Sequence, residues 1–321
     1  MLNDLVSIII VNYNGKLYLK KCLDSLTKIN YSNYEIILVD NHSSDGSIEF
    51  VKSKYSSIKI IELDQNYGFA EPNNIAAKTA TGKYFLFLNN DTIVTPNFVN
   101  ELVKVMAHDS QISISQSMLL KPNGNVDSSG DFVDTLGRAY SSKDNPKDTR
   151  LILSAKGASM MIRNDIFWNL DGFDKNFFAS FEDVDIGWRS WISGYKVVLV
   201  PNSIVYHTGG QTIKDINSLI TFHGVKNSII LRLTNFEINY VIKSMTILFY
   251  VIVTKKLFGV SLIKDPEEIS PLPSFGIMIK GLLWILKNSK YIFTKRKKVN
   301  AERIISTNDL LKKGLVTKYS F

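Results

Sequence analysis

The chain has 321 residues, of which 45% are hydrophobic and 21% charged, with a formal net charge of +8. This composition excludes a largely disordered protein, and the length suits one large domain with an appendage, or two domains. Cys22 is the only cysteine, which excludes a disulfide framework and a multi-cysteine zinc site and fits a reducing compartment. The first residues show no basic segment followed by an apolar one, so we expect no secretory signal there.

Short apolar segments alternate with helical patterns over the first 92 residues. We predict strands over residues 6–11, 35–39, 58–63 and 84–88, and helices over 17–26, from 45 onward and over 73–79. This alternation predicts an α/β fold, with a mostly parallel central sheet and helices on both faces. Ligands of such sheets bind beyond the carboxyl ends of the strands, which is where Asn12, Asp40 and Asp91 fall.

The middle of the chain is predicted to hold a loop and a second helical unit. Residues 127–149 are polar and rich in Ser, Asp and Gly, which favours a lid or binding loop. Residues 151–161 are apolar again, residues 182–193 form a predicted helix that ends at Gly194, and residues 197–200 form a late strand.

The C-terminal region, residues 216–321, is basic and is predicted to be helical. It carries 17 Lys and Arg against 6 Asp and Glu, a net of +11, whereas residues 1–215 carry a net of −3. Such a tail favours an anionic surface, either lipid or nucleic acid, although a soluble basic helical cap is an alternative. The apolar segments 244–254 and 281–286 are shorter than the ~20 residues that span a bilayer. They suit helices that lie in a membrane interface, or that pack on each other or on a partner subunit.

Three polar constellations could carry chemistry. Asn89-Asn90-Asp91 follows a buried strand, and a carboxylate there suits a divalent cation that neutralises a nucleotide diphosphate. The alternative for this segment is an ordinary Asn/Asp-rich turn. His207 could supply a nitrogen ligand to the same ion, and its alternative is a purely structural histidine. Glu182, Asp183 and Asp185 begin a helix after an aromatic segment, which suits a general base or simple capping. No P-loop, dinucleotide fingerprint or nucleophile elbow is present, which removes NTPases, dehydrogenases and hydrolases.

Seven collinear segments resemble the family 2 glycosyltransferases, in particular the rhamnosyltransferase-like members that build surface polysaccharides. The matching stretches are residues 6–15, 39–47, 66–70, 80–92, 156–163, 172–189 and 206–212. The resemblance implies a GT-A fold over residues 1–215, followed by the helical, basic region 216–321. It also implies an inverting transfer of a sugar from a nucleotide-diphosphate donor.

The resemblance assigns a role to each matching position. It makes Asp183 the general base, and Asp91 and His207 the ligands of a divalent cation, Mg²⁺ or Mn²⁺. The donor nucleotide is contacted by Val11, Asn12, Tyr13, Asp40, Asn66, Gly68, Asn89 and Asn90. The acceptor or the donor sugar is gripped by Glu182, Asp185, Trp188 and Arg189. Asn89 replaces the first carboxylate of the D-x-D-like element, which predicts modest metal affinity, and Pro72 lacks an N–H that could contact the donor.

The expected partners follow from the resemblance and the basic tail. We expect dTDP-rhamnose or a UDP-hexose as donor, and an oligosaccharide or lipid-linked glycan as acceptor. The protein would then lie at the membrane surface, cytoplasmic and peripheral at the inner face of the cell membrane. Residues 295–298 are too short a basic run to favour nucleic acid, and a homo-oligomer is left open. The alternative function is a non-catalytic nucleotide-binding scaffold of a polysaccharide assembly complex. A nucleotidyltransferase is a third hypothesis, but it requires a Gly-rich phosphate loop, which residues 12–15 do not form.

Overall fold

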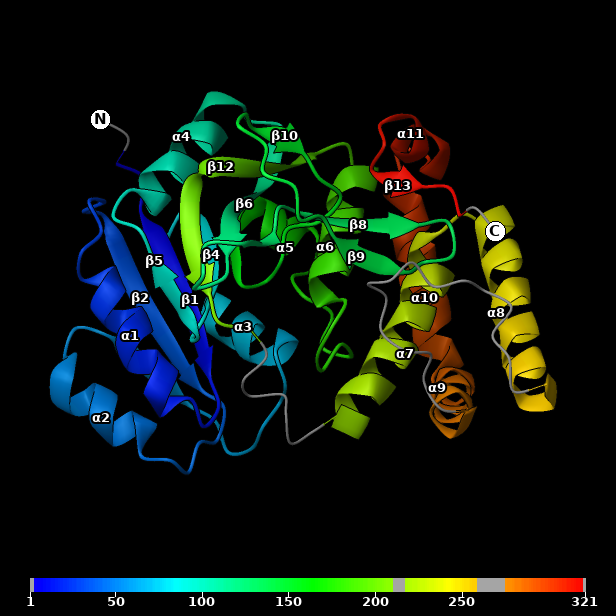
Figure 1. Cartoon of the computed structure of the whole chain (residues 1–321), viewed down its shortest axis with the longest axis horizontal. Coiled ribbons are helices and arrows are strands. Elements are labelled where there is room, and N and C mark those ends of the chain that lie inside the picture. The colour runs from blue at the N-terminus through cyan, green and yellow to red at the C-terminus, as the bar shows by residue number, and fades with distance from the viewer. Residues whose placement is uncertain (1–2, 210–216, 259–274, 320–321) are drawn as a thin grey trace.

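The computed structural model describes residues 3–209, 217–258 and 275–319 (Figure 1). Its first part alternates strands and helices as predicted. The elements are β1 (Val6–Asn12), α1 (Lys16–Leu26), β2 (Tyr34–Asp40), α2 (Ser47–Lys54), β3 (Lys59–Glu62), α3 (Ala70–Ala77) and β4 (Tyr84–Asn89). The strands pair in parallel in the order β3-β2-β1-β4.

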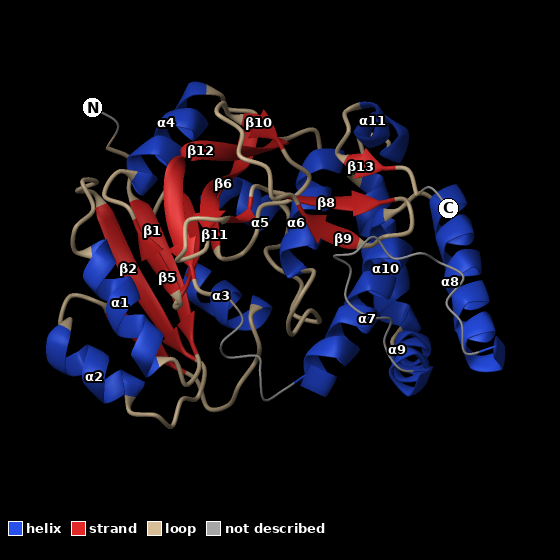
Figure 2. Cartoon of the chain, in the orientation of Figure 1, coloured by secondary structure: helices blue, strands red, loops and turns tan. Residues whose placement is uncertain are grey.

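These central strands are buried on both faces because successive side chains point into two different cores. Ile9 and Phe87 pack in one apolar cluster, together with Trp188 and Trp191. Ile8 packs in the other cluster, with residues of the helices on the opposite face. The helices α1 and α4 (Phe98–His108) therefore cover one face of the sheet, and α3, α5 (Asn164–Asn169) and α6 (Glu182–Ile192) cover the other (Figures 1 and 2).

The second part of the sheet is mixed, so the prediction of a mostly parallel sheet holds only for its N-terminal strands. Strand β11 runs antiparallel between β4 and β6, and β12 is parallel to β6. The elements are β5 (Thr92–Val94), α4 (Phe98–His108), β6 (Ile112–Leu120), β7 (Val126–Ser128), β8 (Asp131–Asp134), β9 (Ala139–Ser141), β10 (Arg150–Leu151), β11 (Ser159–Arg163), α5 (Asn164–Asn169), α6 (Glu182–Ile192) and β12 (Lys196–His207).

The segment 127–149, predicted as a loop, contains short strands. Strand β7 pairs antiparallel with the end of β6, and β8 and β9 belong to a small separate sheet. Strand β13 (Val316–Thr317) pairs in parallel with β8, so a segment near the end of the chain returns to this excursion (Figure 2).

The described part of the C-terminal region is helical, as predicted. Its elements are α7 (Asn217–Asn235), α8 (Ile238–Phe258), α9 (Phe275–Lys287), α10 (Ser289–Ala301), α11 (Thr307–Lys312) and β13 (Val316–Thr317). Helices α7, α9 and α10 share a small apolar core with Phe177. Among the residues that the structure describes, no helix is both long and apolar enough to cross a bilayer.

Candidate active site

The register of the sheet brings the predicted strand-end residues together. Asn12 ends β1 and pairs with Asp40, which ends β2, and Val11 pairs with Asn89 at the end of β4. Because these strands are parallel, their carboxyl ends form one edge of the sheet. The polar residues that were singled out from three distant segments therefore share one site.

Asn12 organises the loop that follows β1. Its side chain is fully buried; Nδ2 donates to Ser47 Oγ at 2.9 Å, and Oδ1 accepts from Asn90 Nδ2 at 2.8 Å. Gly15 packs closely against these two amides, because a Cβ there would lie 2.2 Å from Asn90 Nδ2 and the Asn90 side chain would have to shift. Asp40 accepts the backbone N–H of Ser43 at 2.9 Å. Asn12 and Asn90 thus support this edge of the sheet from within, whereas Val11 and Tyr13 are only partly buried.

A second loop, residues 66–68, is held against this edge by Asn41. Asn41 Nδ2 donates to Asn66 Oδ1 and to the carbonyl of Gly68, both at 2.8 Å. Gly68 has a φ of +80°, and a Cβ there would lie 2.0 Å from the carbonyl oxygen of Phe178. Sequence reasoning missed Asn41, although it is a polar residue directly after a predicted strand and lies inside one of the matching segments.

Asp91 and His207 also meet at this edge. Strand β12 pairs antiparallel with β5, which places His207 opposite Thr92. His207 Nε2 lies 3.4 Å from Asp91 Oδ1 and 3.5 Å from Asn89 Nδ2, and each of the two side chains, Asp91 and His207, is 8% exposed. Asp127 lies on the far side of the ring, with Oδ2 2.8 Å from Nδ1. Asp127 was missed because it lies in the segment that was predicted to be a loop.

These donors fit a hard divalent cation that is bound mainly through substrate phosphate. One carboxylate and one imidazole are few ligands, and the described residues contain no group of three or more His, Cys, Asp or Glu side chains suited to a metal. Mg²⁺ is commonly held by one or two carboxylates together with substrate phosphates, so a diphosphate would complete the set. Two atoms at 2.0–2.1 Å from one ion lie at most about 4.2 Å apart, and the 3.4 Å between Asp91 and His207 satisfies that limit.

The protonation of His207 follows from its two carboxylate neighbours. Burial disfavours the charged ring, but the contacts with Asp127 and Asp91 outweigh it and raise the pKa of His207 to about 9. Without a cation the ring is therefore protonated at neutral pH and bridges the two acids. A cation at Nε2 has to displace one proton.

Asp183 lies at the start of α6, after Ser180 and Phe181, which both have positive φ. Its Oδ1 accepts the N–H of Val184 at 2.8 Å, and its Oδ2 accepts the N–H of Gly157 at 3.2 Å. Burial raises the pKa of Asp183, against the lowering effect of these two N–H groups and of Lys156. A carboxylate that is fixed in place and has a raised pKa is suited to accept a proton.

Two further carboxyl groups surround Asp183. Glu182 is buried, its Oε2 has no partner among the described residues, and burial together with the Asp183 charge raises its pKa well above the usual range. Asp131, on β8, is hydrogen-bonded to Ser141, and burial followed by the Asp183 charge raises its pKa to about 6. Asp131 comes from the same excursion as Asp127, and sequence reasoning missed it for the same reason.

Residues 157–158 connect Asp183 to the end of β4. The N–H of Gly157 reaches Asp183, and the carbonyl of the next residue, Ala158, accepts the N–H of Asn89 at 3.1 Å. The start of α6 and the end of β4 are thus joined through two successive residues. Asp183 and the strand-end cluster therefore lie in one region of the structure.

Three of the four predicted sugar contacts lie elsewhere. Trp188 is fully buried and stacks on Phe236, with ring centroids 4.5 Å apart. Asp185 is fully buried and pairs with Arg189 at 2.7 Å and with Lys295 at 2.9 Å. The prediction took these residues as sugar contacts from the resemblance alone, whereas the helix turns their side chains into the core. Glu182 alone stays beside Asp183.

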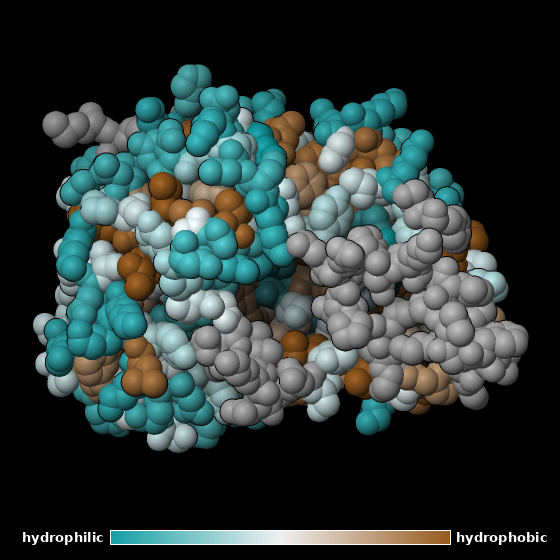
Figure 3. Space-filling view, in the orientation of Figure 1, coloured by the Kyte–Doolittle hydropathy of each residue, from teal (hydrophilic) through white to brown (hydrophobic). Residues whose placement is uncertain are grey.

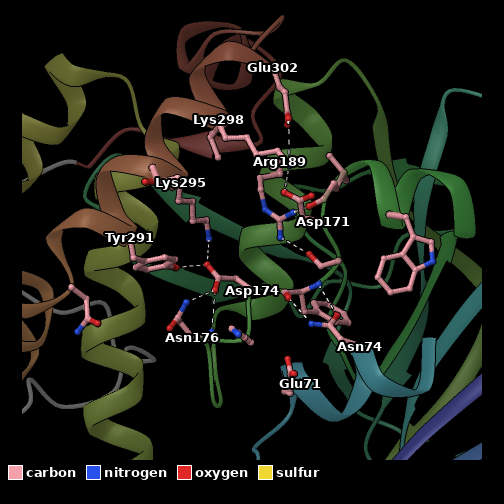
Figure 4. Close-up of a pocket in the computed structure, with 18 of the residues that line it drawn as sticks. Glu71, Asn74, Asp171, Asp174, Asn176, Arg189, Tyr291, Lys295, Lys298 and Glu302 are labelled. Carbon is pink, nitrogen blue, oxygen red and sulfur yellow. Dashed lines mark hydrogen bonds and ion pairs between the residues drawn. The ribbon is translucent and has the colours of Figure 1, made fainter. Parts of the chain in front are cut away.

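Arg189 also lines a separate cavity of about 880 Å³ between α3, the segment 168–176 and α10 (Figure 4). Most of the charged groups labelled there pair with one another. Lys295 contacts Asp174 at 2.6 Å, and Lys298 pairs with Asp171. The cavity shares only Arg189 with the predicted site, and its ion pairs attach α10 to the rest of the chain.

Comparisons with known proteins agree with this geometry. Residues 7–171 match the sequence profile of glycosyl transferase family 2, which is half of the chain. The chain is 30% identical over 218 residues to the O-antigen biosynthesis protein RfbC of Myxococcus xanthus, covering 63% of this chain and 17% of that protein. It is 21% identical over 252 residues to the N-acetylglucosaminyl-diphospho-decaprenol L-rhamnosyltransferase of Mycobacterium tuberculosis. This match covers 69% of this chain and 82% of that protein. The chain spans only 17% to 39% of the length of RfbC and two other glycosyltransferase relatives.

Solved structures share the fold. GalNAc-T7 with UDP, GalNAc and Mn²⁺ superposes with a TM-score of 0.61 at 18% identity, over 91% of this chain and 57% of that one. S. aureus TarS 1–349 in complex with UDP-GlcNAc superposes with a TM-score of 0.58 at 16% identity, over 92% and 87%. These likenesses show the GT-A fold.

Proposed function

Since the chain belongs to glycosyl transferase family 2, we propose that it is an inverting glycosyltransferase of cell-surface polysaccharide synthesis. The donor is a nucleotide-diphosphate sugar, and the acceptor is a glycan or a lipid-linked glycan. The observation that carries this proposal is the position of Asp183. Its carboxylate is held by two backbone N–H groups, has a raised pKa, and is joined through residues 157–158 to the strand-end cluster of Asn89, Asp91 and His207.

The reaction needs one base. Asp183 takes the proton from an acceptor hydroxyl as that oxygen attacks the anomeric carbon, and the bond to the nucleotide diphosphate breaks on the opposite side. Attack opposite the leaving group inverts the anomeric configuration, and no covalent enzyme intermediate forms. A divalent cation, Mg²⁺ or Mn²⁺, held by Asp91 and His207 would offset the charge that grows on the leaving diphosphate.

The donor lies along the edge formed by β1, β2 and β4. Asp40, Asn12 and Tyr13 line the nucleotide end, and Asn66, Gly68, Asn89 and Asn90 complete the pocket. The relative from M. tuberculosis is named a rhamnosyltransferase, which favours dTDP-rhamnose, whereas a UDP-hexose is the second choice. Solved relatives that contain UDP or UDP-GlcNAc support a nucleotide sugar in this place.

A panel of nucleotide sugars, screened by thermal shift with Mn²⁺ and with EDTA, tests the proposal. We expect the correct donor to raise the Tm of the wild type only when Mn²⁺ is present, because a ligand that binds the folded state stabilises it. Asp91→Ala should lose that metal-dependent shift. Asp148→Ala, at an exposed position of the 127–149 excursion, serves as control and should keep it. An equal shift in Asp91→Ala, or a shift that EDTA does not change, contradicts the ligand assignment.

The acceptor and the location follow from the C-terminal helices. Residues 216–321 carry a net charge of +11. Large apolar side chains are also exposed there: Ile242 at 62%, Phe249 at 68%, Leu286 at 70% and Phe293 at 77%. Lysines beside apolar surface suit the interface of an anionic membrane. The proposed place is therefore the cytoplasmic face of the cell membrane, where a lipid-linked glycan would be presented.

A non-catalytic nucleotide-binding scaffold is the second candidate. The observation that favours it is the small number of protein ligands for a cation, since Asn89 stands where the family's element has its first carboxylate. A scaffold would bind nucleotide and show no turnover with any acceptor. The intact Glu182-Asp183 pair weighs against it.

A further inference from the structure

The imidazole of His207 contacts a carboxylate at each of its two nitrogens. Nε2 lies 3.4 Å from Asp91 Oδ1, and Nδ1 lies 2.8 Å from Asp127 Oδ2. The second distance is typical of a charge-assisted hydrogen bond, whereas the first is too long for a strong one. The contact with Asp127 therefore fixes the ring. Nε2 is the nitrogen that remains available to a ligand.

Asp127 reaches His207 because β7 is irregular at this residue. Strand β7 pairs antiparallel with β6 through Leu119 with Ser128 and Leu120 with Val126, and the register shifts between these pairs. Asp127 is thus the extra residue of a β-bulge, a feature that re-aims a side chain and is common beside active sites.

On the other side of β6, Leu120 also pairs with Tyr206 of β12, the residue before His207. Strands β7 and β12 therefore flank the same end of β6. The side chains of Asp127 and His207 meet beyond that end, at 18% and 8% exposure. The bulge therefore directs a partly buried carboxylate, that of Asp127, toward His207.

We propose that Asp127 is a positioning residue for the cation site. Its carboxylate accepts the Nδ1–H of His207 and holds the ring so that Nε2 faces Asp91 and the cation. This inference rests on the cation site of the proposed function. A histidine that ligates a metal usually donates its other N–H to such a partner, and loss of the partner typically weakens metal binding 10–100-fold.

The first test measures Mn²⁺ affinity, from the electron paramagnetic resonance signal of free Mn²⁺ in the presence of UDP. We expect Asp127→Ala to bind Mn²⁺ about 10–100-fold more weakly than the wild type. Asp127→Asn keeps the shape of the side chain and a neutral acceptor, so its Mn²⁺ affinity should fall less than that of Asp127→Ala. Asp148→Asn, the same change at an exposed position of the excursion, should lose nothing. A Mn²⁺ affinity of Asp127→Ala within twofold of the wild type overturns the inference.

The second test needs no metal. The chain has only four histidines, so ¹⁵N-histidine labelling resolves each ring, and His207→Asn assigns the signal. We expect a downfield, slowly exchanging Nδ1–H resonance for His207 in the metal-free wild type and in Asp148→Asn. The resonance should be absent from Asp127→Ala and should shift upfield in Asp127→Asn. A resonance that is missing from the wild type, or unchanged in both Asp127 variants, overturns the inference.

The two tests separate this inference from the proposed function. A wild type that shows the resonance but takes up no Mn²⁺ would reject the cation site while the orientation by Asp127 stands. If Asp127→Ala does not fold, the isosteric Asp127→Asn carries both measurements.

Discussion

At the scale of single residues, the site depends on how burial and hydrogen bonding act on each carboxylate. Burial raises the pKa of Asp183 from its ordinary value of 3.8, and the N–H groups of Gly157 and Val184 oppose that rise. For Glu182, burial and the Asp183 charge outweigh a backbone N–H and raise the pKa well above its ordinary value of 4.5. Burial thus raises the pKa of both neighbouring acids, and Asp183 is the one whose carboxylate is held by the N–H groups of Gly157 and Val184.

The raised pKa of Asp183 predicts the acid side of the pH profile. The base acts when it is deprotonated, so kcat/KM should rise with pH and should inflect above 3.8. Lys156 lowers the pKa of Asp183, so Lys156→Met should move the inflection to higher pH. Lys147→Met, at an exposed position, serves as control. An inflection of the Lys156→Met profile at the wild-type pH, or below it, would contradict this electrostatic account.

At the scale of helices and strands, local patterns predicted the strand-end residues well. An apolar strand that runs into polar residues places them at the sheet edge, as for Asn12, Asp40 and Asp91. The pattern could not predict the positions of Asp127 and Asp131. A β-bulge in β7 positions Asp127, and the small sheet that includes β13 positions Asp131. The resemblance took Trp188 and Arg189 as sugar contacts, whereas the structure buries both. Which side of α6 faces the core depends on the packing of α7 and α10, which begin only at residues 217 and 289.

Helix α10 is attached to the α/β part of the chain by a partly buried lysine. Lys295, with a side chain 12% exposed, lies between Asp174 and Asp185. Lys295→Ala removes the ion-pair partner that the structure gives Asp174, while Asp185 keeps Arg189, so we expect a loss of about 3 kcal/mol in the free energy of unfolding. Urea denaturation measures it, with Lys297→Ala, an exposed neighbour, as the control expected to stay within about 0.5 kcal/mol. Equal stability of the two variants would show that the ion pairs do not stabilise this contact.

At the scale of the whole molecule, the catalytic part and the helical region share structural elements. Strand β13 pairs with β8, and α10 packs on α7 and contacts α6 through Lys295. The surface around α2 and α4 is largely hydrophilic (Figure 3), whereas exposed apolar side chains gather on α8, α9 and α10. The molecule thus presents different surfaces at its two ends, and the basic, apolar end suits a membrane.

Binding to vesicles tests the membrane proposal. The full chain should float with vesicles that contain phosphatidylglycerol at low salt, bind phosphatidylcholine vesicles less, and dissociate as salt screens the charges. Replacing the exposed Leu286 and Phe293 with serine should weaken binding, because both side chains contribute apolar area. The same change at Leu17, which is 82% exposed on α1, serves as the control. Failure of the wild type to bind anionic vesicles would reject the location.

The most direct test of the central claim is Asp183→Asn, assayed with the donor that the nucleotide-sugar panel identifies. Asparagine keeps the shape of the side chain but cannot take the proton from the acceptor. We expect transfer to be abolished, while the metal-dependent affinity for the donor nucleotide stays within about twofold of the wild type. Near-normal turnover in Asp183→Asn would contradict the assignment of Asp183 as the base, and a wild type that binds the nucleotide but transfers no sugar would favour the scaffold.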